Sequence, residues 1–312
     1  MSNAFVFPGQ GSQSVGMMAA LAEMSPIIHS TFNEATEVLG WDTWALISDG
    51  PTELINQTDK TQPIMLAAGV ATWRLWQEIN HSSKKPNYMT GHSLGEYAAL
   101  VCADALNFQD GLLLVQERGK YMQDCVPAGA GAMAAILGLH NEEVLKICAA
   151  AAENQVLQAV NFNSPGQVVI AGNKEAIERS LLLAKEAGAK RVVLLPVSVP
   201  SHCDLMKPAA EKLKARLQNI TISKPNIPVV NNASVTVNDD AKNIKDALVK
   251  QLYSPVRWVE TIEYLTQNGV NTIVECGPGK VLTGLNKRIN RQLELYTMTD
   301  KASLEKVNSM WG

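Results

Sequence analysis

A serine between two glycines is the clearest chemical signal in the chain, in the run Gly91-His92-Ser93-Leu94-Gly95. This G-x-S-x-G spacing is typical of a nucleophile elbow, in which a strand ends in a sharp turn that carries the serine and then enters a helix. Glycines suit the turn because it brings backbone segments too close together to admit a Cβ atom. The N–H of Leu94 would lie at the helix N-terminus, where it can donate to an oxyanion. The spacing predicts nucleophilic catalysis by Ser93, although the same pattern also occurs in ordinary turns.

A serine nucleophile needs a general base, and the chain has five histidines from which to choose it. His92 adjoins Ser93, but neighbouring side chains on a tight turn point apart. Three others are expected in a helix, in a polar loop and in a separate small domain: His29, His81 and His140. His202 is therefore the candidate base by elimination. It lies in a loop before a helix expected at about 205–217, where a histidine could also serve only to cap or pack.

A second glycine-containing loop, residues 8–13, follows the apolar run Ala4-Phe5-Val6-Phe7, which is typical of a buried strand. Such loops often hold phosphate, so a nucleotide site is one interpretation. The spacing matches neither GxGxxG nor a P-loop, and no lysine follows in place. We therefore favour a loop whose backbone N–H groups point into a site, with Gln10 as the second oxyanion donor. A helix is expected to follow at about 15–22.

The composition excludes several classes of protein. The 312 residues are 46% hydrophobic and carry a formal net charge of −3, so nucleic-acid binding is not indicated. No apolar run approaches the length of a membrane span, and a strand-like segment begins too early for a signal peptide. The five cysteines form no C-x-x-C pair, which indicates reduced thiols and no metal site. We expect a cytoplasmic protein.

The sequence pattern predicts a large α/β domain that is interrupted by a small domain. After the small-residue stretch 127–131, the pattern strand, helix, strand, strand, helix, strand extends over about 70 residues, as in ferredoxin-like domains. The expected strands and helices cover 132–139, 141–154, 156–161, 167–171, 174–187 and 191–197. We therefore expect a ferredoxin-like domain at 128–197, inserted into a large domain formed by 1–127 and 198–312. Arg118 falls in a helix expected at 108–125, where an arginine is usually solvated.

Segments spread over nearly the whole chain closely resemble the malonyl-CoA:acyl carrier protein transacylases of bacterial fatty acid synthesis. These segments are 7–13, 61–63, 91–97, 118–120, 161–167, 200–202 and 275–280. The resemblance implies an α/β-hydrolase-like large domain with a parallel sheet and an inserted ferredoxin-like domain. Together these motifs are far more specific than G-x-S-x-G alone.

The resemblance also implies roles for individual residues. Ser93 would be the nucleophile and His202 the base, and Arg118 would bind the malonyl carboxylate, against the expectation from its residue type. The backbone carbonyl of Gln251 would orient the histidine, with little importance for the side chain. The backbone N–H groups of Gln10 and Leu94 would form the oxyanion hole. The implied substrate-binding residues are Gln62, Met122, Asn163 and Ser201.

The implied reaction transfers the malonyl group from malonyl-CoA to acyl carrier protein. The resemblance implies no cofactor and no metal, and we expect neither nucleic acid nor a membrane as a partner. We expect the protein to be a monomer. Acyl carrier proteins are acidic, so a basic surface should receive them. Candidate positions are Lys190, Arg191, Lys280, Lys287 and Arg288, although such charges are more often merely solvated. The alternatives are a serine thioesterase or esterase, a polyketide-type acyltransferase, and a non-catalytic docking domain.

Overall fold

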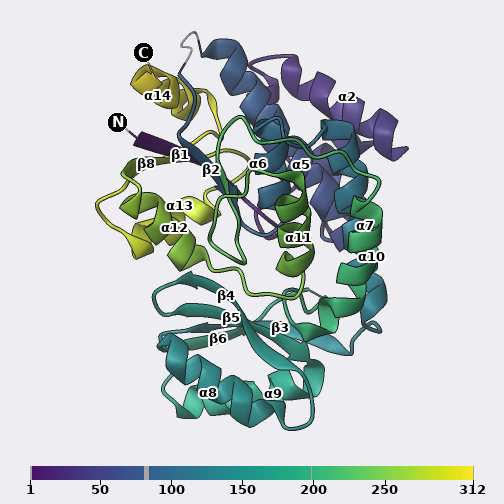
Figure 1. The fold of residues 1–312 in the computed structure, drawn as a ribbon, viewed down its shortest axis with the longest axis vertical. Helices are drawn as coiled ribbons and strands as arrows, with labels where there is room; N and C mark the ends of the chain where they lie inside the picture. The colour runs from purple at the N-terminus through teal and green to yellow at the C-terminus, as the bar shows by residue number, and fades with distance from the viewer. Residues whose placement is uncertain (1, 81–83, 198, 312) are drawn as a thin grey trace.

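The computed structural model describes residues 2–80, 84–197 and 199–311, and these form two layered parts, each built on its own sheet (Figure 1). His81, one of the histidines considered as a base, lies outside the described residues, as does position 198, where the large domain is expected to resume. Within the described ranges, no helix is long and apolar enough to cross a membrane.

The larger sheet has five parallel strands in the order β7-β2-β1-β8-β9. Their bounds are β1 Ser2–Phe7, β2 Tyr88–Gly91, β7 Val229–Val230, β8 Val270–Glu275 and β9 Glu294–Thr297. The strand β1 lies at the centre, and its residues Ala4 to Phe7 are fully buried, because helices cover both faces of a parallel sheet. The carboxyl ends of β1, β2 and β7 therefore meet at one edge, which is where the G-x-S-x-G turn lies.

Helices surround this sheet (Figure 1). They are α1 Ala19–Ala22, α2 Ile27–Leu39, α3 Thr43–Asp49, α4 Thr52–Ile55, α5 Thr58–Ile79, α6 Gly95–Cys102, α7 Phe108–Cys125, α10 Lys207–Leu217, α11 Ala241–Gln251, α12 Trp258–Gln267, α13 Val281–Ile289 and α14 Lys301–Trp311, with a 3-10 turn at Asp204–Met206. The helix expected at about 15–22 is shorter, because the N–H of Gly16 bonds the carbonyl of Ile47 and its φ is +80°.

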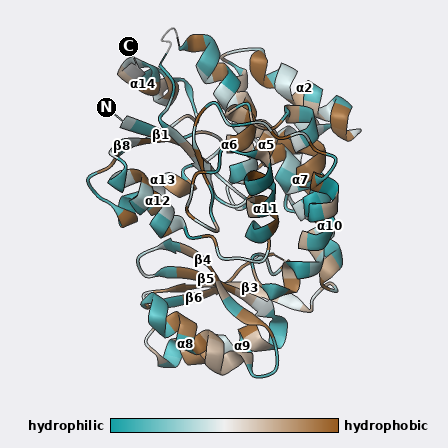
Figure 2. Ribbon diagram, viewed as in Figure 1, coloured by the Kyte–Doolittle hydropathy of each residue, from teal (hydrophilic) through white to brown (hydrophobic). Residues whose placement is uncertain are grey.

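The smaller sheet has four antiparallel strands in the order β4-β5-β3-β6, with α8 and α9 packed on one face (Figure 1). The elements are β3 Gly131–Leu137, α8 Asn141–Ala152, β4 Leu157–Ser164, β5 Gln167–Asn173, α9 Lys174–Glu186 and β6 Arg191–Leu194. Figure 2 shows hydrophobic residues along β3, β5 and the two helices, which share one core. The predicted α/β class and ferredoxin-like arrangement are confirmed.

Strand β4 joins the two parts. The N–H of Phe162 donates to the carbonyl of Val256 at 3.0 Å, and the N–H of Val256 donates to the carbonyl of Val160 at 2.8 Å. These bonds hold the end of β4 against the segment before α12, which belongs to the larger part. The division of the chain into 1–127 with 198–312 and 128–197 remains our proposal.

Candidate active site

The G-x-S-x-G segment forms a sharp turn between β2 and α6, as the spacing predicts. Ser93 has a φ of +52°, in the left-handed region that non-glycine residues rarely adopt. A Cβ atom on Gly91 would lie 2.0 Å from the carbonyl carbon of Gly95, and one on Gly95 would lie 2.0 Å from the carbonyl oxygen of Phe7. Both glycines are therefore required for this turn, which projects the serine hydroxyl from the edge of the sheet.

His202 lies beside the serine. Its Nε2 is 2.7 Å from Oγ of Ser93, and its Nδ1 is 2.8 Å from the backbone carbonyl of Gln251. A carbonyl only accepts hydrogen bonds, so Nδ1 carries the proton and Nε2 is free to accept one from the serine. Burial, and next the charge of Arg118, lower the pKa of His202 to about 3. The imidazole is therefore neutral at physiological pH, as a base must be.

Arg118 lies in the same site, and it is 1% exposed, so the expectation from its residue type alone is wrong. Its Nη1 donates to Oε1 of Gln62 at 2.7 Å. Its Nη2 donates to Oγ of Ser93 at 3.2 Å and to Oε1 of Gln251 at 3.1 Å. Within the part of the chain that the structure describes, no carboxylate forms an ion pair with this guanidinium. The site thus holds a buried cation beside a serine–histidine pair.

The two expected oxyanion donors lie in the same cavity, whose volume is about 110 Å³. Leu94 and Gln10 both line it, next to Ser93. The loop that carries Gln10 packs tightly on the turn, since a Cβ atom on Gly9 would lie 2.3 Å from the carbonyl oxygen of His92. Neither N–H has a hydrogen-bond partner among the described residues, which leaves both available to an oxyanion.

The four residues expected to bind substrate have different surroundings. Gln62, Met122 and Ser201 line the cavity, and Nε2 of Gln62 lies 3.5 Å from Sδ of Met122. Asn163 is buried behind the cavity wall, where its Oδ1 lies 2.9 Å from Nε2 of His92, which does line the cavity. Asn161, two residues earlier on β4, lines the cavity instead. Residue 163 falls in a register shift of β4, where the regular alternation of side chains is interrupted, so residues 161 and 163 have different neighbours.

The chain is similar to known proteins over almost its whole length. Residues 4–306 match the family model described as the acyl transferase domain. The malonyl CoA-acyl carrier protein transacylase of Salmonella typhimurium is 56% identical over 301 residues, covering 96% of this chain and 97% of that protein. The corresponding protein of Haemophilus influenzae is 56% identical over 304 residues, covering 97% of each chain. The chain belongs to the family of malonyl CoA-acyl carrier protein transacylases.

Solved structures of such transacylases share this fold over the whole chain. A malonyl-transacylase in complex with a type II PKS acyl-carrier protein is 53% identical, with a TM-score of 0.97, covering 99% of this chain and 100% of that one. An acyl carrier protein S-malonyltransferase from Vibrio cholerae is 56% identical, with a TM-score of 0.95, covering 98% of this chain and 100% of that one.

Asn232 also belongs to the site of this transacylase, although the sequence did not identify it as a site residue. Its Oδ1 accepts from the N–H of Ser93 at 2.6 Å, and its Nδ2 donates to the carbonyl of Gly91 at 2.7 Å. One side chain therefore holds both sides of the nucleophile turn. The signal in the sequence was a strand ending in polar residues, because β7 pairs in parallel with β2 and the two strands end together.

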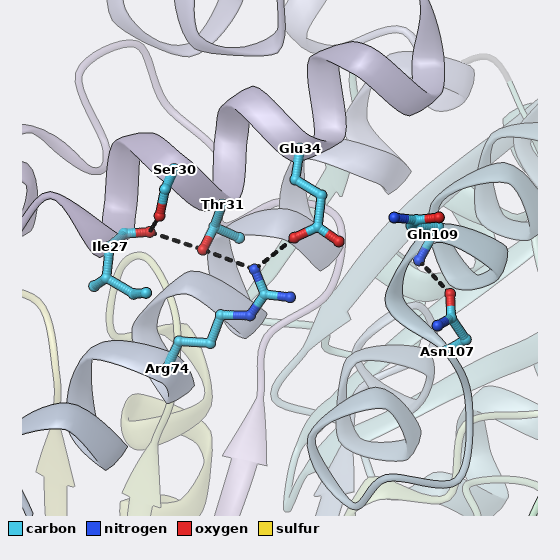
Figure 3. Close-up of polar contacts among 7 residues, drawn as sticks. All are labelled: Ile27, Ser30, Thr31, Glu34, Arg74, Asn107 and Gln109. Atoms are coloured by element: carbon cyan, nitrogen blue, oxygen red, sulfur yellow. Dashed lines mark hydrogen bonds and ion pairs between the residues drawn. The ribbon is translucent and has the colours of Figure 1, made fainter.

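A larger cavity of about 470 Å³ lies elsewhere in the same transacylase fold, between α2, α5 and the start of α7. Arg74 lines it and points toward α2, where its Nη1 donates to Glu34 at 2.8 Å and to Thr31 at 3.1 Å (Figure 3). Its guanidinium also lies 4.7 Å from the ring centroid of Phe108. The charge of this arginine is paired with a carboxylate, and no serine–histidine pair accompanies it among the residues that line the cavity.

Proposed function

We propose that this enzyme, an S-malonyltransferase, moves malonyl from malonyl-CoA to the phosphopantetheine thiol of acyl carrier protein through a malonyl ester on Ser93, supplying fatty acid synthesis. The observation that carries the residue assignment is the position of Arg118, whose Nη2 is 3.2 Å from the Oγ that is itself 2.7 Å from His202. A guanidinium matches a carboxylate in two hydrogen bonds, so a malonyl group bound there would present its thioester to the serine.

The first half-reaction loads the enzyme. His202 accepts the proton of Ser93 at Nε2 as Oγ attacks the thioester carbon. The oxyanion is held by the N–H groups of Leu94 and Gln10, each of which is worth on the order of 10²–10³ in rate. The C–S bond then breaks, and the sulfur of CoA leaves with the proton from His202. Malonyl remains as an ester on Ser93.

The second half-reaction reverses these steps with a different thiol. The phosphopantetheine thiol of acyl carrier protein gives its proton to His202 as its sulfur attacks the ester carbon. The oxyanion collapses, the C–O bond breaks, and Ser93 leaves with the proton. The proposed steps use no cofactor and no metal, and we propose that the enzyme acts as a monomer. We place the enzyme in the cytoplasm, where its five free cysteines stay reduced.

Acyl carrier protein would dock on a basic surface formed by Lys190, Arg191, Lys280, Lys287 and Arg288, all exposed. Two contacts support one continuous surface around the β4–β5 turn. Arg288 Nη1 donates to Gln167 at 2.7 Å, and the side chain of Lys190 packs beside Gly138, which bonds the carbonyl of Gly166 at 2.8 Å. Charge reversal at Lys287 and Arg288 should weaken the apparent affinity for acyl carrier protein; an unchanged affinity would exclude this surface.

Intact mass tests the reaction. After mixing with malonyl-CoA, the protein should gain one malonyl group, which acyl carrier protein discharges, and the Ser93→Ala variant should gain none. Steady release of free malonate without an adduct would instead indicate a hydrolase. No adduct and no turnover would contradict the proposal outright.

A further inference from the structure

A buried carboxylate that the mechanism does not use lies three residues after the nucleophile. Glu96 is 3% exposed, in the first turn of α6. Its Oε1 accepts from Nδ2 of Asn231 at 2.5 Å, and its Oε2 accepts from the N–H of Asn232 at 3.0 Å and from Nε2 of Gln251 at 2.8 Å. Burial raises the pKa of Glu96, but all three partners are donors and oppose that shift, so the contacts match an ionised carboxylate, which only accepts.

These contacts determine which way the amide of Gln251 points. Its Nε2 donates to Glu96 and, at 3.1 Å, to the carbonyl of Ser93, while its Oε1 accepts from Arg118 at 3.1 Å. An amide turned the other way would place its NH₂ group against the guanidinium and its oxygen against the carboxylate. Both contacts would be repulsive, and the oxygen would also meet the carbonyl of Ser93, so Glu96 and that carbonyl together select the observed orientation.

Resting on the function proposed above, we propose that Glu96 is a positioning residue: it fixes Gln251, and through Gln251 it fixes the guanidinium of Arg118 where the acyl carboxylate binds. The backbone carbonyl of the same Gln251 orients His202 at 2.8 Å. One residue thus joins the group that selects the substrate to the group that activates the nucleophile. The expectation that its side chain has little importance is not supported by these contacts.

The consequence is a guanidinium held in place before substrate arrives. Arg118 is anchored on one side by Gln62 and on the other by Gln251, so both ends of its donor fork are fixed. Without Glu96 the amide of Gln251 keeps only the neutral carbonyl of Ser93 as an acceptor, so its orientation is less firmly held and the anchor that it gives the guanidinium is weakened. Misplacement of a binding group by about 1 Å can cost on the order of 10² in rate. Because acetyl has no carboxylate, its transfer should suffer less than malonyl transfer.

The test is the Glu96→Gln variant, assayed for acyl-enzyme formation from malonyl-CoA and from acetyl-CoA. The ratio of the two kcat/KM values should fall at least about tenfold, mainly through a higher KM for malonyl-CoA. Glu275→Gln is the matched control, because Glu275 is equally buried but bonds the backbone N–H groups of Leu282 and Thr283 at the start of α13. That control should lower Tm and leave the ratio unchanged.

A second variant keeps the test decisive if Glu96→Gln fails to fold. Gln251→Met retains the backbone carbonyl that orients His202 and removes only the amide, so it should lower the ratio by a similar factor. Combined in one chain, the two substitutions should lower the ratio no further than either alone, because they act through one contact. A normal ratio in a folded Glu96→Gln or Gln251→Met variant would overturn the proposal. Failure of the wild-type enzyme to load malonyl would instead contradict the proposed function.

Discussion

Two arginines line cavities in this molecule, and their surroundings differ in charge and in burial. Arg74 has a side chain that is 29% exposed and is paired with Glu34 at 2.8 Å, beside a cavity of about 470 Å³ (Figure 3). Arg118 is 1% exposed and lines a cavity of about 110 Å³. Its hydrogen bonds go to two amide oxygens and a hydroxyl, which leaves the positive charge without a carboxylate in direct contact.

The difference in charge supports our proposal that the smaller cavity is the active site. Burying an ion without a counter-ion is costly, by several kcal/mol even after the surroundings relax. A fold keeps such a charge where a ligand completes the pair, and a malonyl carboxylate would do so at Arg118. At Arg74 the pair is already complete, and its partners are only partly buried, so it contributes on the order of 1 kcal/mol to stability. The volume of a cavity therefore does not by itself identify an active site, and the charges of its lining residues must be considered as well.

The largest expected effect in this comparison comes from a pair of histidines. His202→Ala should slow loading of Ser93 by on the order of 10⁵–10⁶, because the serine loses its base. His29, exposed on the same helix as Glu34, is the matched control, and His29→Ala should change the rate less than about twofold. Stopped-flow loading with malonyl-CoA measures both. Equal rates in the two variants would contradict the assignment of the base.

A smaller effect on kcat is expected for two asparagines, one beside the nucleophile turn and one at the start of a helix. Asn232→Ala should lower kcat by about 10–10², because both backbone groups that it holds on the nucleophile turn become unpaired in the interior. Asn107 caps α7 by accepting from the N–H groups of Gln109 and Asp110. Asn107→Ala should cost about 1 kcal/mol of stability and leave kcat nearly unchanged. Thermal melts measure the stability of the two variants, and initial rates measure their kcat. A kcat equal to wild type in Asn232→Ala would show that the nucleophile turn keeps its conformation without this side chain.

The smallest effect expected is on the pH profile of activity. Burial lowers the pKa of His202 to about 3, so the base is already neutral at pH 5. The value of kcat/KM for malonyl-CoA should therefore vary less than about threefold between pH 5 and pH 8. An inflection near pH 6.5 in that profile would show that the base has an ordinary pKa.

The lowered pKa of His202 also makes the folded protein less stable at low pH. The unfolded chain takes up a proton on this histidine below about pH 6.5, whereas the folded chain does so only near pH 3. The free energy of unfolding should therefore fall as the pH is lowered between these values, by about 2 kcal/mol from pH 6.5 to pH 5. Urea denaturation should show a smaller fall in the His202→Asn variant; an equal fall would assign the pH dependence to other groups.

The sequence alone predicts those features of the site that are local. The nucleophile turn follows from the spacing of Gly91, Ser93 and Gly95, because both glycines are needed within a single turn. The small domain follows from the order of its strands and helices. His202 follows from elimination among few histidines, which works because histidine is rare in this chain.

Features that depend on distant pairings could not be predicted in this way. Asn232 meets Ser93 only because β7 pairs with β2 across some 140 residues of chain, and a polar residue after a strand does not reveal its partner. The burial of Arg118 depends on α7 packing against α5, so residue type alone predicts the opposite. The side chain of Gln251 has the same property, since its partners come from two separate segments, the nucleophile turn with the start of α6 and the helix α7.

The most direct measurement replaces each of the two arginines with alanine, one at a time. Arg118→Ala and Arg74→Ala are each mixed with malonyl-CoA and acetyl-CoA, and the rate of adduct formation on Ser93 is followed by intact mass. Arg118→Ala should lose malonyl preference by on the order of 10³–10⁴, because a site built around a polar group rejects the analogue that lacks it. Arg74→Ala should retain the wild-type preference. A strong preference for malonyl in Arg118→Ala, or its loss in Arg74→Ala, would contradict the account.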